Sequence, residues 1–63
     1  MKFYIEQCIG GYWVVCEPGD GWPRYLTKRY RGRRTWMFDY TYAKTYSKRT
    51  AQTIVRELEA ENR

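Results

Sequence analysis

The chain has 63 residues, of which 43% are hydrophobic and 19% aromatic, so it is long enough for one small domain, residues 1–63, and too aromatic for a disordered segment. Twelve Lys and Arg against seven Asp and Glu give a formal net charge of +5, which favours an acidic partner. No apolar run approaches the roughly 18 residues of a membrane span and no segment resembles a signal peptide, so we expect a cytoplasmic protein without a membrane partner.

The first predicted element is a β-hairpin over residues 2–16. The stretches "KFYIEQC" and "YWVVC" are rich in aromatic and β-branched residues, and they flank two glycines that we expect to form a two-residue turn. Counting outward from this turn pairs Ile5 with Cys16. The expected core face carries Phe3, Ile5, Val14 and Cys16, with Ile9 and Tyr12 near the turn.

The two cysteines are expected to be reduced. In the predicted register Cys8 and Cys16 point to opposite faces of the hairpin, so a disulfide would need a bulge or a register shift. With no His and only two Cys, the sequence also offers no zinc site. We expect neither a metal nor a cofactor.

A loop and a second hairpin are predicted next. The segment "EPGDGWPR", residues 17–24, contains two Pro and two Gly and is expected to leave the first hairpin as a loop. Trp22 in this loop either covers the edge of the core or serves as an exposed anchor for a partner. The stretches "RYLTKRY" and "RRTWMFDYTY" have the composition of strands and flank Gly32, while the spacing within residues 24–31 also allows a helical turn.

The last predicted element is an amphipathic helix over residues 48–61. Ser47 is a good N-cap, and Tyr46 before it can pack over Ala51 as a hydrophobic staple. The apolar stripe consists of Ala51, Ile54, Val55 and Leu58. The predicted fold is therefore α+β: a small antiparallel sheet of three to four strands, packed by one C-terminal helix.

The sequence does not predict an enzyme. It has no His, and its acidic residues are not spaced as a recognisable pair, so general acid–base chemistry has no candidate. The glycine-containing segments are typical of turns and are followed by no helix start, unlike a phosphate-binding glycine loop.

The basic residues form a candidate binding surface. Between Gly21 and Phe38 there are six basic residues and no acidic one, and five of the six are Arg, whose planar fork suits phosphate and carboxylate. Interleaved Tyr and Trp rings could stack on bases, although a polar hairpin tip is the alternative. In a hairpin reversed at Gly32, Arg29 and Arg34 share a face with Trp36, whereas Arg33 shares the other face with Tyr30 and Lys28. The candidate residues in this region are Arg24, Lys28, Arg29, Tyr30, Arg31, Arg33, Arg34 and Trp36, with Trp22 as a possible anchor.

A second cluster of positive charge lies around the start of the helix. Lys48 and Arg49 occupy the first turn and glutamates the last turns, which is the reverse of what the helix dipole favours. Together with Lys44 and the free backbone N–H groups, these residues predict an anion-binding corner. The alternative is that the dipole effect is too small to matter in a packed helix.

The segment "YAKTYSKRTAQTIVREL" resembles a strand-to-helix junction found in small phage and prophage proteins. The matching positions are Tyr42, Tyr46, Ser47 and Ala51. A similar junction occurs in the arm-type DNA-binding domains of phage integrases, and "GGYWVVCEP" is similar to their opening hairpin, whose sheet enters the major groove. The loop "EPGDG" departs from that pattern.

By size and type the chain is also similar to anti-CRISPR proteins and other small phage-encoded inhibitors, which bind without catalysis. Two hypotheses follow. In the first, a monomer or homodimer binds nucleic acid directly, DNA in preference to RNA. In the second, it docks on an acidic or nucleic-acid-binding host complex in the cytoplasm of the host cell.

Overall fold

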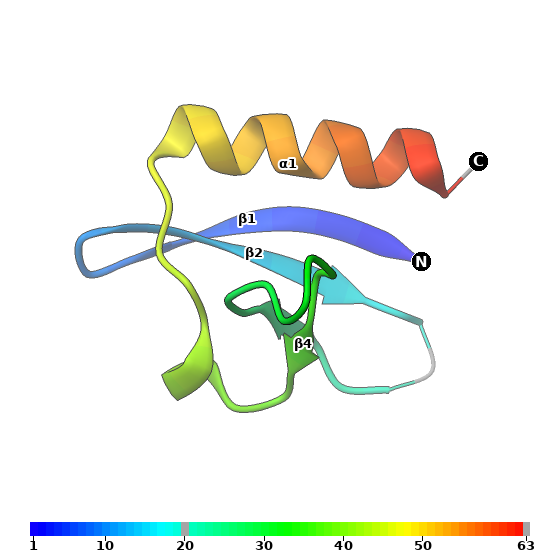
Figure 1. Cartoon of the computed structure of the whole chain (residues 1–63), viewed down its shortest axis with the longest axis horizontal. Helices are drawn as coiled ribbons and strands as arrows, with labels where there is room; N and C mark the ends of the chain where they lie inside the picture. Colours follow the sequence, from blue (N-terminus) through cyan, green and yellow to red (C-terminus); the bar gives the residue numbers. More distant parts are fainter. Residues whose placement is uncertain (20, 63) are drawn as a thin grey trace.

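The computed structural model describes residues 1–19 and 21–62, in which one helix lies across one face of a four-stranded antiparallel sheet (Figure 1). The strand order is β1-β2-β3-β4, so strands that are consecutive in sequence are paired. The elements are β1 (Lys2–Cys8), β2 (Gly11–Glu17), β3 (Arg24–Leu26), β4 (Trp36–Met37), the 3-10 helix η1 (Tyr40–Tyr42) and α1 (Lys48–Glu61). The predicted α+β architecture is confirmed, with four strands.

The first hairpin forms as predicted but in a different register. Cys8 pairs with Gly11 and Ile5 with Val14, so the turn residues are Ile9 and Gly10 rather than the two glycines. Gly11 is the first residue of β2, and a side chain does not fit there because a Cβ would lie 2.5 Å from the carbonyl oxygen of Tyr46. The pairing differs from the expected one by two residues, an even number, so Phe3, Ile5, Val14 and Cys16 still share one face. Ile9 was expected near the turn on this core face, but it lies in the turn itself and is fully exposed, so that part of the prediction is wrong.

Both cysteines are free thiols in the structure. The observed register keeps Cys8 and Cys16 on opposite faces of the hairpin, as predicted. Burial raises the pKa of the Cys16 thiol, although the nearby Arg24 partly offsets this effect. Cys16 therefore stays protonated and packs as a small apolar side chain.

The core lies between α1 and the predicted face of the sheet. Val14, Leu26, Ala51 and Leu58 are buried there, and they are flanked by Phe3, Ile5, Tyr12, Trp36, Tyr46, Ile54 and Val55. The Phe3 and Trp36 rings lie 6.1 Å apart between centroids, which links the first and last strands above the sheet. The predicted apolar stripe of the helix therefore packs against the sheet, as expected.

The start of α1 follows from its local sequence. The Ser47 hydroxyl accepts a hydrogen bond from the backbone N–H of Thr50 at 3.2 Å, which confirms the predicted N-cap. Tyr46 packs against the core cluster that contains Ala51, as a hydrophobic staple does. Tyr46 also exchanges two backbone hydrogen bonds with Tyr12, each 2.8 Å long, and these fix the end of the connection to β2.

The second hairpin has shorter strands than predicted. β4 ends at Met37 because the Asp39 carboxylate accepts a hydrogen bond from the Thr41 N–H at 2.9 Å, which caps η1 instead of continuing the strand. The prediction that residues 40–42 are extended is therefore wrong. The helical alternative for residues 24–31 is also wrong, since residues 24–26 pair with both β2 and β4.

The loop between β2 and β3 is confirmed for its described residues, and Asp20 lies outside them. Trp22 in this loop is 78% exposed, so the prediction that it covers the core edge is wrong. In the part of the chain that the structure describes, no helix has the length and apolar character needed to cross a bilayer.

The sheet face opposite α1 carries an aromatic layer. The Trp13 ring lies edge-on to Tyr25 at 5.4 Å and tilted against Tyr40 at 5.6 Å. Val15 is on the same face and is fully buried. Several of the seven tyrosines are thus structural, which composition alone does not reveal.

Candidate functional site

The tip of the second hairpin presents arginines to solvent. Tyr30 and Arg33 exchange two backbone hydrogen bonds across a two-residue turn, in which Arg31 has φ 52° and Gly32 φ 77°. Positive φ at both central residues is typical of a type I′ turn, which matches the twist of the flanking strands. Arg29, Arg31 and Arg33 are exposed around this turn. We call residues 28–34 the basic hairpin.

A bulge separates this tip from β3 and β4. Leu26 is opposite Trp36, whereas Tyr30 is opposite Arg33, so the three residues 27–29 face the two residues 34–35. The Thr35 hydroxyl donates to the Lys28 carbonyl oxygen at 2.8 Å and holds the bulged segment in place. A bulge bends the strand that carries it and increases the local twist.

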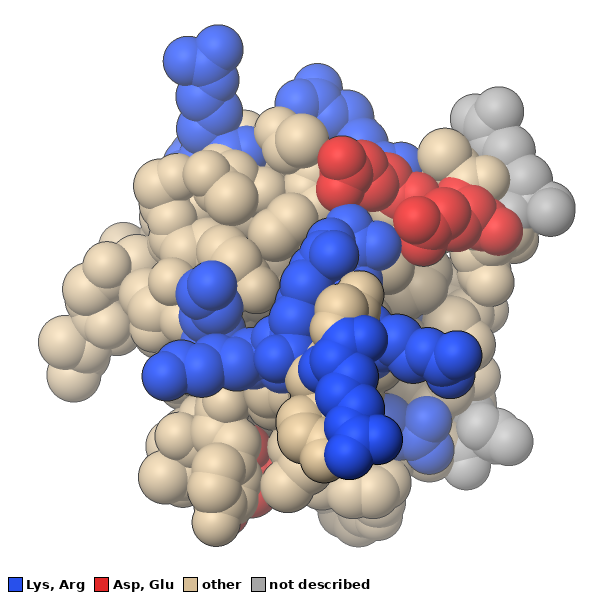
Figure 2. Space-filling model, viewed as in Figure 1, with Lys and Arg blue, Asp and Glu red and all other residues tan. Residues whose placement is uncertain are grey.

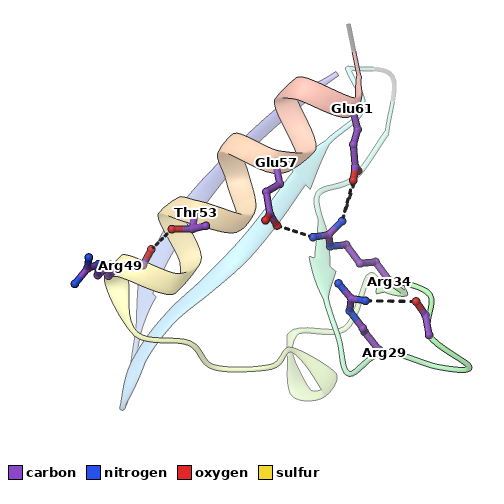
Figure 3. Close-up of polar contacts among 7 residues, drawn as sticks. Arg29, Arg34, Arg49, Thr53, Glu57 and Glu61 are labelled. Carbon is purple, nitrogen blue, oxygen red and sulfur yellow. Dashed lines mark hydrogen bonds and ion pairs between the residues drawn. The ribbon is translucent and has the colours of Figure 1, made fainter.

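Positive charge gathers over this hairpin. Figure 2 shows Lys and Arg side chains crowded on the face below α1, with a patch of Asp and Glu at its upper margin. Arg29 and Arg34 point to the same side, toward the helix (Figure 3). This agrees with the predicted sharing of a face with Trp36, which packs on the helix side of the sheet.

Arg34 connects the hairpin to the helix. Its guanidinium lies 2.9 Å from a carboxylate oxygen of Glu57 and 3.4 Å from one of Glu61 (Figure 3). The Arg34 side chain is 20% exposed, more sheltered than either glutamate. These ion pairs give the acidic end of α1 a tertiary role, which the sequence did not reveal because the partners are 23 and 27 residues apart.

A small cavity lies beside this ion pair. It has a volume of about 220 Å³ and is bounded by the hairpin, the connection before α1 and the helix itself. Its lining residues are Leu26, Thr27, Arg29, Arg34, Lys44, Tyr46 and Ile54. Three of the seven are cationic and none is acidic.

Tyr46 also lines this cavity. Burial raises the pKa of Tyr46, and the positive charges of Arg34 and Arg29 partly counteract the rise. The phenol is therefore protonated at neutral pH and can donate a hydrogen bond. Sequence reasoning identified Tyr46 only as a staple, because nothing in the local pattern places it beside the hairpin arginines.

The structure places the three residues of the predicted corner at and before the start of α1. Lys44 turns to the hairpin cavity, and its backbone N–H donates to the Leu26 carbonyl at 3.0 Å. The Lys48 ammonium lies 6.0 Å from the centre of the Tyr12 ring. Arg49 lies at the opposite end of α1 from the Arg34 ion pairs (Figure 3). A joint anion site formed by these three residues stays a prediction.

The predicted stacking rings differ in their availability. Tyr30 is 64% exposed at the hairpin tip, with the Arg31 guanidinium 5.4 Å from its centre. Trp36 is half-buried against Phe3, so its ring is part of the core. Tyr30 is thus the ring of this pair that a partner can reach.

A second cavity, of about 440 Å³, opens at the base of the same hairpin. It is lined by Trp22, Pro23, Tyr25 and Phe38. Phe38 is 60% exposed, and the Arg24 guanidinium lies 5.1 Å from the centre of its ring. Phe38 was not among the predicted site residues. The available signal was Asp39, because Asp favours an Asx turn that ends a strand and leaves the residue before it at the strand end.

Comparison of the chain with protein-family models, with curated proteins and with solved structures gave no match. The proposals below therefore rest on the chemistry of the surface. It presents an arginine-rich turn and, beside it, a small cavity lined by three cationic residues.

Proposed function

We propose that this protein is a non-enzymatic binding module whose basic hairpin contacts the backbone of nucleic acid, DNA in preference to RNA, in the cytoplasm. The observation that carries the proposal is the turn itself. It holds Arg29, Arg31 and Arg33 exposed on one rigid, hydrogen-bonded tip, with Tyr30 between them. Arginine forks bind phosphate oxygens, and an exposed ring stacks on bases.

The arrangement favours phosphate over a purely solvated role. An arginine in the left-handed region costs about 1–2 kcal/mol relative to a relaxed backbone, and Asn or Gly would fit the turn better. Arg31 nevertheless occupies this position, with φ 52°. A charged residue in a backbone conformation that lowers the stability of the fold is expected where a binding partner requires the charge.

A matched pair of double variants tests the proposal. Arg31→Asn/Arg33→Gln removes two charges from the hairpin, and Lys2→Gln/Arg56→Gln removes two exposed charges from β1 and α1. Fluorescence anisotropy with a short labelled DNA, duplex and single-stranded, measures the affinity at low salt. We expect the hairpin variant to bind at least about tenfold more weakly, since a charge-assisted contact typically contributes roughly 1.5–3 kcal/mol.

The control variant should lose no more than about threefold, because it lowers only the overall charge. Equal losses in the two variants would mean that net charge rather than the hairpin drives binding. Absence of binding by the unmodified protein would refute the proposal outright.

A second function is favoured by one specific observation, the exposed cavity around Trp22 and Phe38. Trp, Tyr and Arg dominate the energetics of protein interfaces, and all three types meet there. In this alternative the protein is a phage-type inhibitor that docks on a host nucleoprotein complex. Co-purification of a nucleic-acid-processing complex after nuclease treatment, lost on Trp22→Ala, would support docking over direct nucleic-acid binding.

A further inference from the structure

We propose that the 220 Å³ cavity between the basic hairpin and α1 is a binding site for a single phosphate group. The inference rests on the proposed function and makes it more specific, because it assigns one phosphate contact to this cavity in addition to the contacts of the arginines of the turn. The residues of the lining that can donate hydrogen bonds to a phosphate are Arg29, Arg34, Lys44 and Tyr46.

The charge of the cavity points to an anion. Among the carboxylates of the described residues, Glu57 and Glu61 bind Arg34, one of the three cations of the cavity. Within residues 1–19 and 21–62, neither Arg29 nor Lys44 forms an ion pair. Two like charges that line one small cavity repel each other, and an anion bound in the cavity offsets this repulsion.

The shape of the cavity limits the size of the anion. Its volume is below the roughly 300–1,000 Å³ of sites that enclose a drug-sized ligand, so it suits one tetrahedral group rather than a whole nucleotide. The side chains of Leu26 and Ile54 form part of the wall. An apolar wall excludes water and strengthens the interaction of the cations with a bound charge.

Arg34 is the pre-organised donor of the site. Its two terminal nitrogens bind Glu57 and Glu61, which fixes the orientation of the guanidinium plane. A guanidinium has five N–H donors, so donors remain for an anion on the cavity side. Fixing the donor before binding reduces the entropy that the anion must overcome.

The phosphate can be a diester in the nucleic-acid backbone or a terminal monoester. Two probes distinguish these sources: dimethyl phosphate represents the diester, and inorganic phosphate represents the monoester. Each is titrated into the full chain at constant ionic strength, with chloride as the balancing anion. Amide resonances of Lys44 and Tyr46 and the Arg29 side-chain Nε–H resonance report on the cavity by nuclear magnetic resonance.

We expect saturable shifts at these resonances with at least one probe. Arg29→Gln and Lys44→Gln should each weaken the apparent affinity by about tenfold, because each removes a charge-assisted contact. Lys44→Arg should restore binding, which shows that the loss is not a folding defect. Arg56→Gln, an equal change in charge outside the cavity lining, should leave the titration unchanged.

Non-saturating shifts with both probes, or an unaltered titration in Arg29→Gln and Lys44→Gln, would overturn the inference. A parallel titration with DNA keeps the two proposals apart. If the protein binds DNA but neither probe binds saturably, the cavity site is refuted and the proposed function is not. If a probe binds saturably but DNA does not bind, the proposed function is refuted and the cavity site is not.

Discussion

At the residue scale, the conformation of Arg31 predicts that one substitution has opposite effects on stability and on DNA binding. A φ of 52° is uncommon for a residue with a Cβ, and Asn tolerates it better. We expect Arg31→Asn to raise the free energy of unfolding by roughly 0.5–1 kcal/mol, measured by chemical denaturation. The same change should weaken DNA binding by roughly three- to tenfold, since one arginine contact is lost.

The variant should be more stable and bind DNA more weakly. It therefore tests whether the arginine at this position of the turn contributes its charge to binding. A stabilised variant with unchanged affinity would show that Arg31 has no role in binding. Arg31→Lys is the matched control, because it keeps the charge in the same backbone conformation and should affect affinity less.

Gly11 is the residue where sequence reasoning failed for a physical reason. Two adjacent glycines predict a turn, and only the tertiary structure shows that Gly11 is needed for close approach to the connection before α1. A Cβ at Gly11 would lie 2.5 Å from the Tyr46 oxygen and 2.8 Å from the Thr45 methyl group. Contacts between residues 34 or more positions apart leave no local trace in the sequence.

We therefore expect Gly11→Ala to lower the free energy of unfolding by about 2 kcal/mol or more, because the Tyr12–Tyr46 backbone pair must shift. Gly21→Ala provides the comparison. Its new methyl group would meet nothing nearer than Pro18 at 3.9 Å, so its effect should stay within about 0.5 kcal/mol. Similar values for the two variants would contradict the packing seen at Gly11.

At the element scale, the helix could be predicted nearly in full and the second hairpin only in part. The Ser47 cap and the spacing of four apolar residues are local signals, and α1 begins and ends where they indicate. The hairpin strands end early because of the bulge at residues 27–29 and the Asp39 cap. Propensity does not reveal a bulge, so β4 was predicted too long.

The contact between hairpin and helix also limits the positive surface. Glu57 and Glu61 place negative charge beside Arg34, so they partly neutralise the face that we assign to nucleic acid. Glu57→Gln should strengthen DNA binding by about two- to fivefold, which corresponds to roughly 0.4–1 kcal/mol. The free energy of unfolding should fall by less than about 1 kcal/mol, since both glutamates are largely exposed.

Isothermal titration with DNA and thermal denaturation measure the two quantities. Glu59→Gln is the matched control, because Glu59 is an exposed glutamate of the same helix with no contact to Arg34 among the ion pairs of the described residues. Equal gains in affinity for Glu57→Gln and Glu59→Gln would show that only net charge matters.

At the scale of the whole molecule, the net charge of +5 is not spread evenly. The basic hairpin and its cavity lie on one face, and the acidic turns of α1 border them (Figure 2). The composition predicts an acidic partner, and the arginine cluster predicts that residues 24–36 contact it. The grouping of Arg29 and Arg34 with Lys44 could not be predicted, because it depends on how the chain folds over the sheet.

The salt dependence of DNA binding tests the central claim most directly. Binding to duplex DNA is measured by anisotropy from 25 to about 200 mM salt, and the logarithm of the association constant is plotted against that of the salt concentration. The account predicts a steep negative slope, reduced by close to two in Arg31→Asn/Arg33→Gln, since each phosphate contact contributes about 0.9. A slope near zero, or the same slope in the hairpin variant as in the unmodified protein, would contradict it.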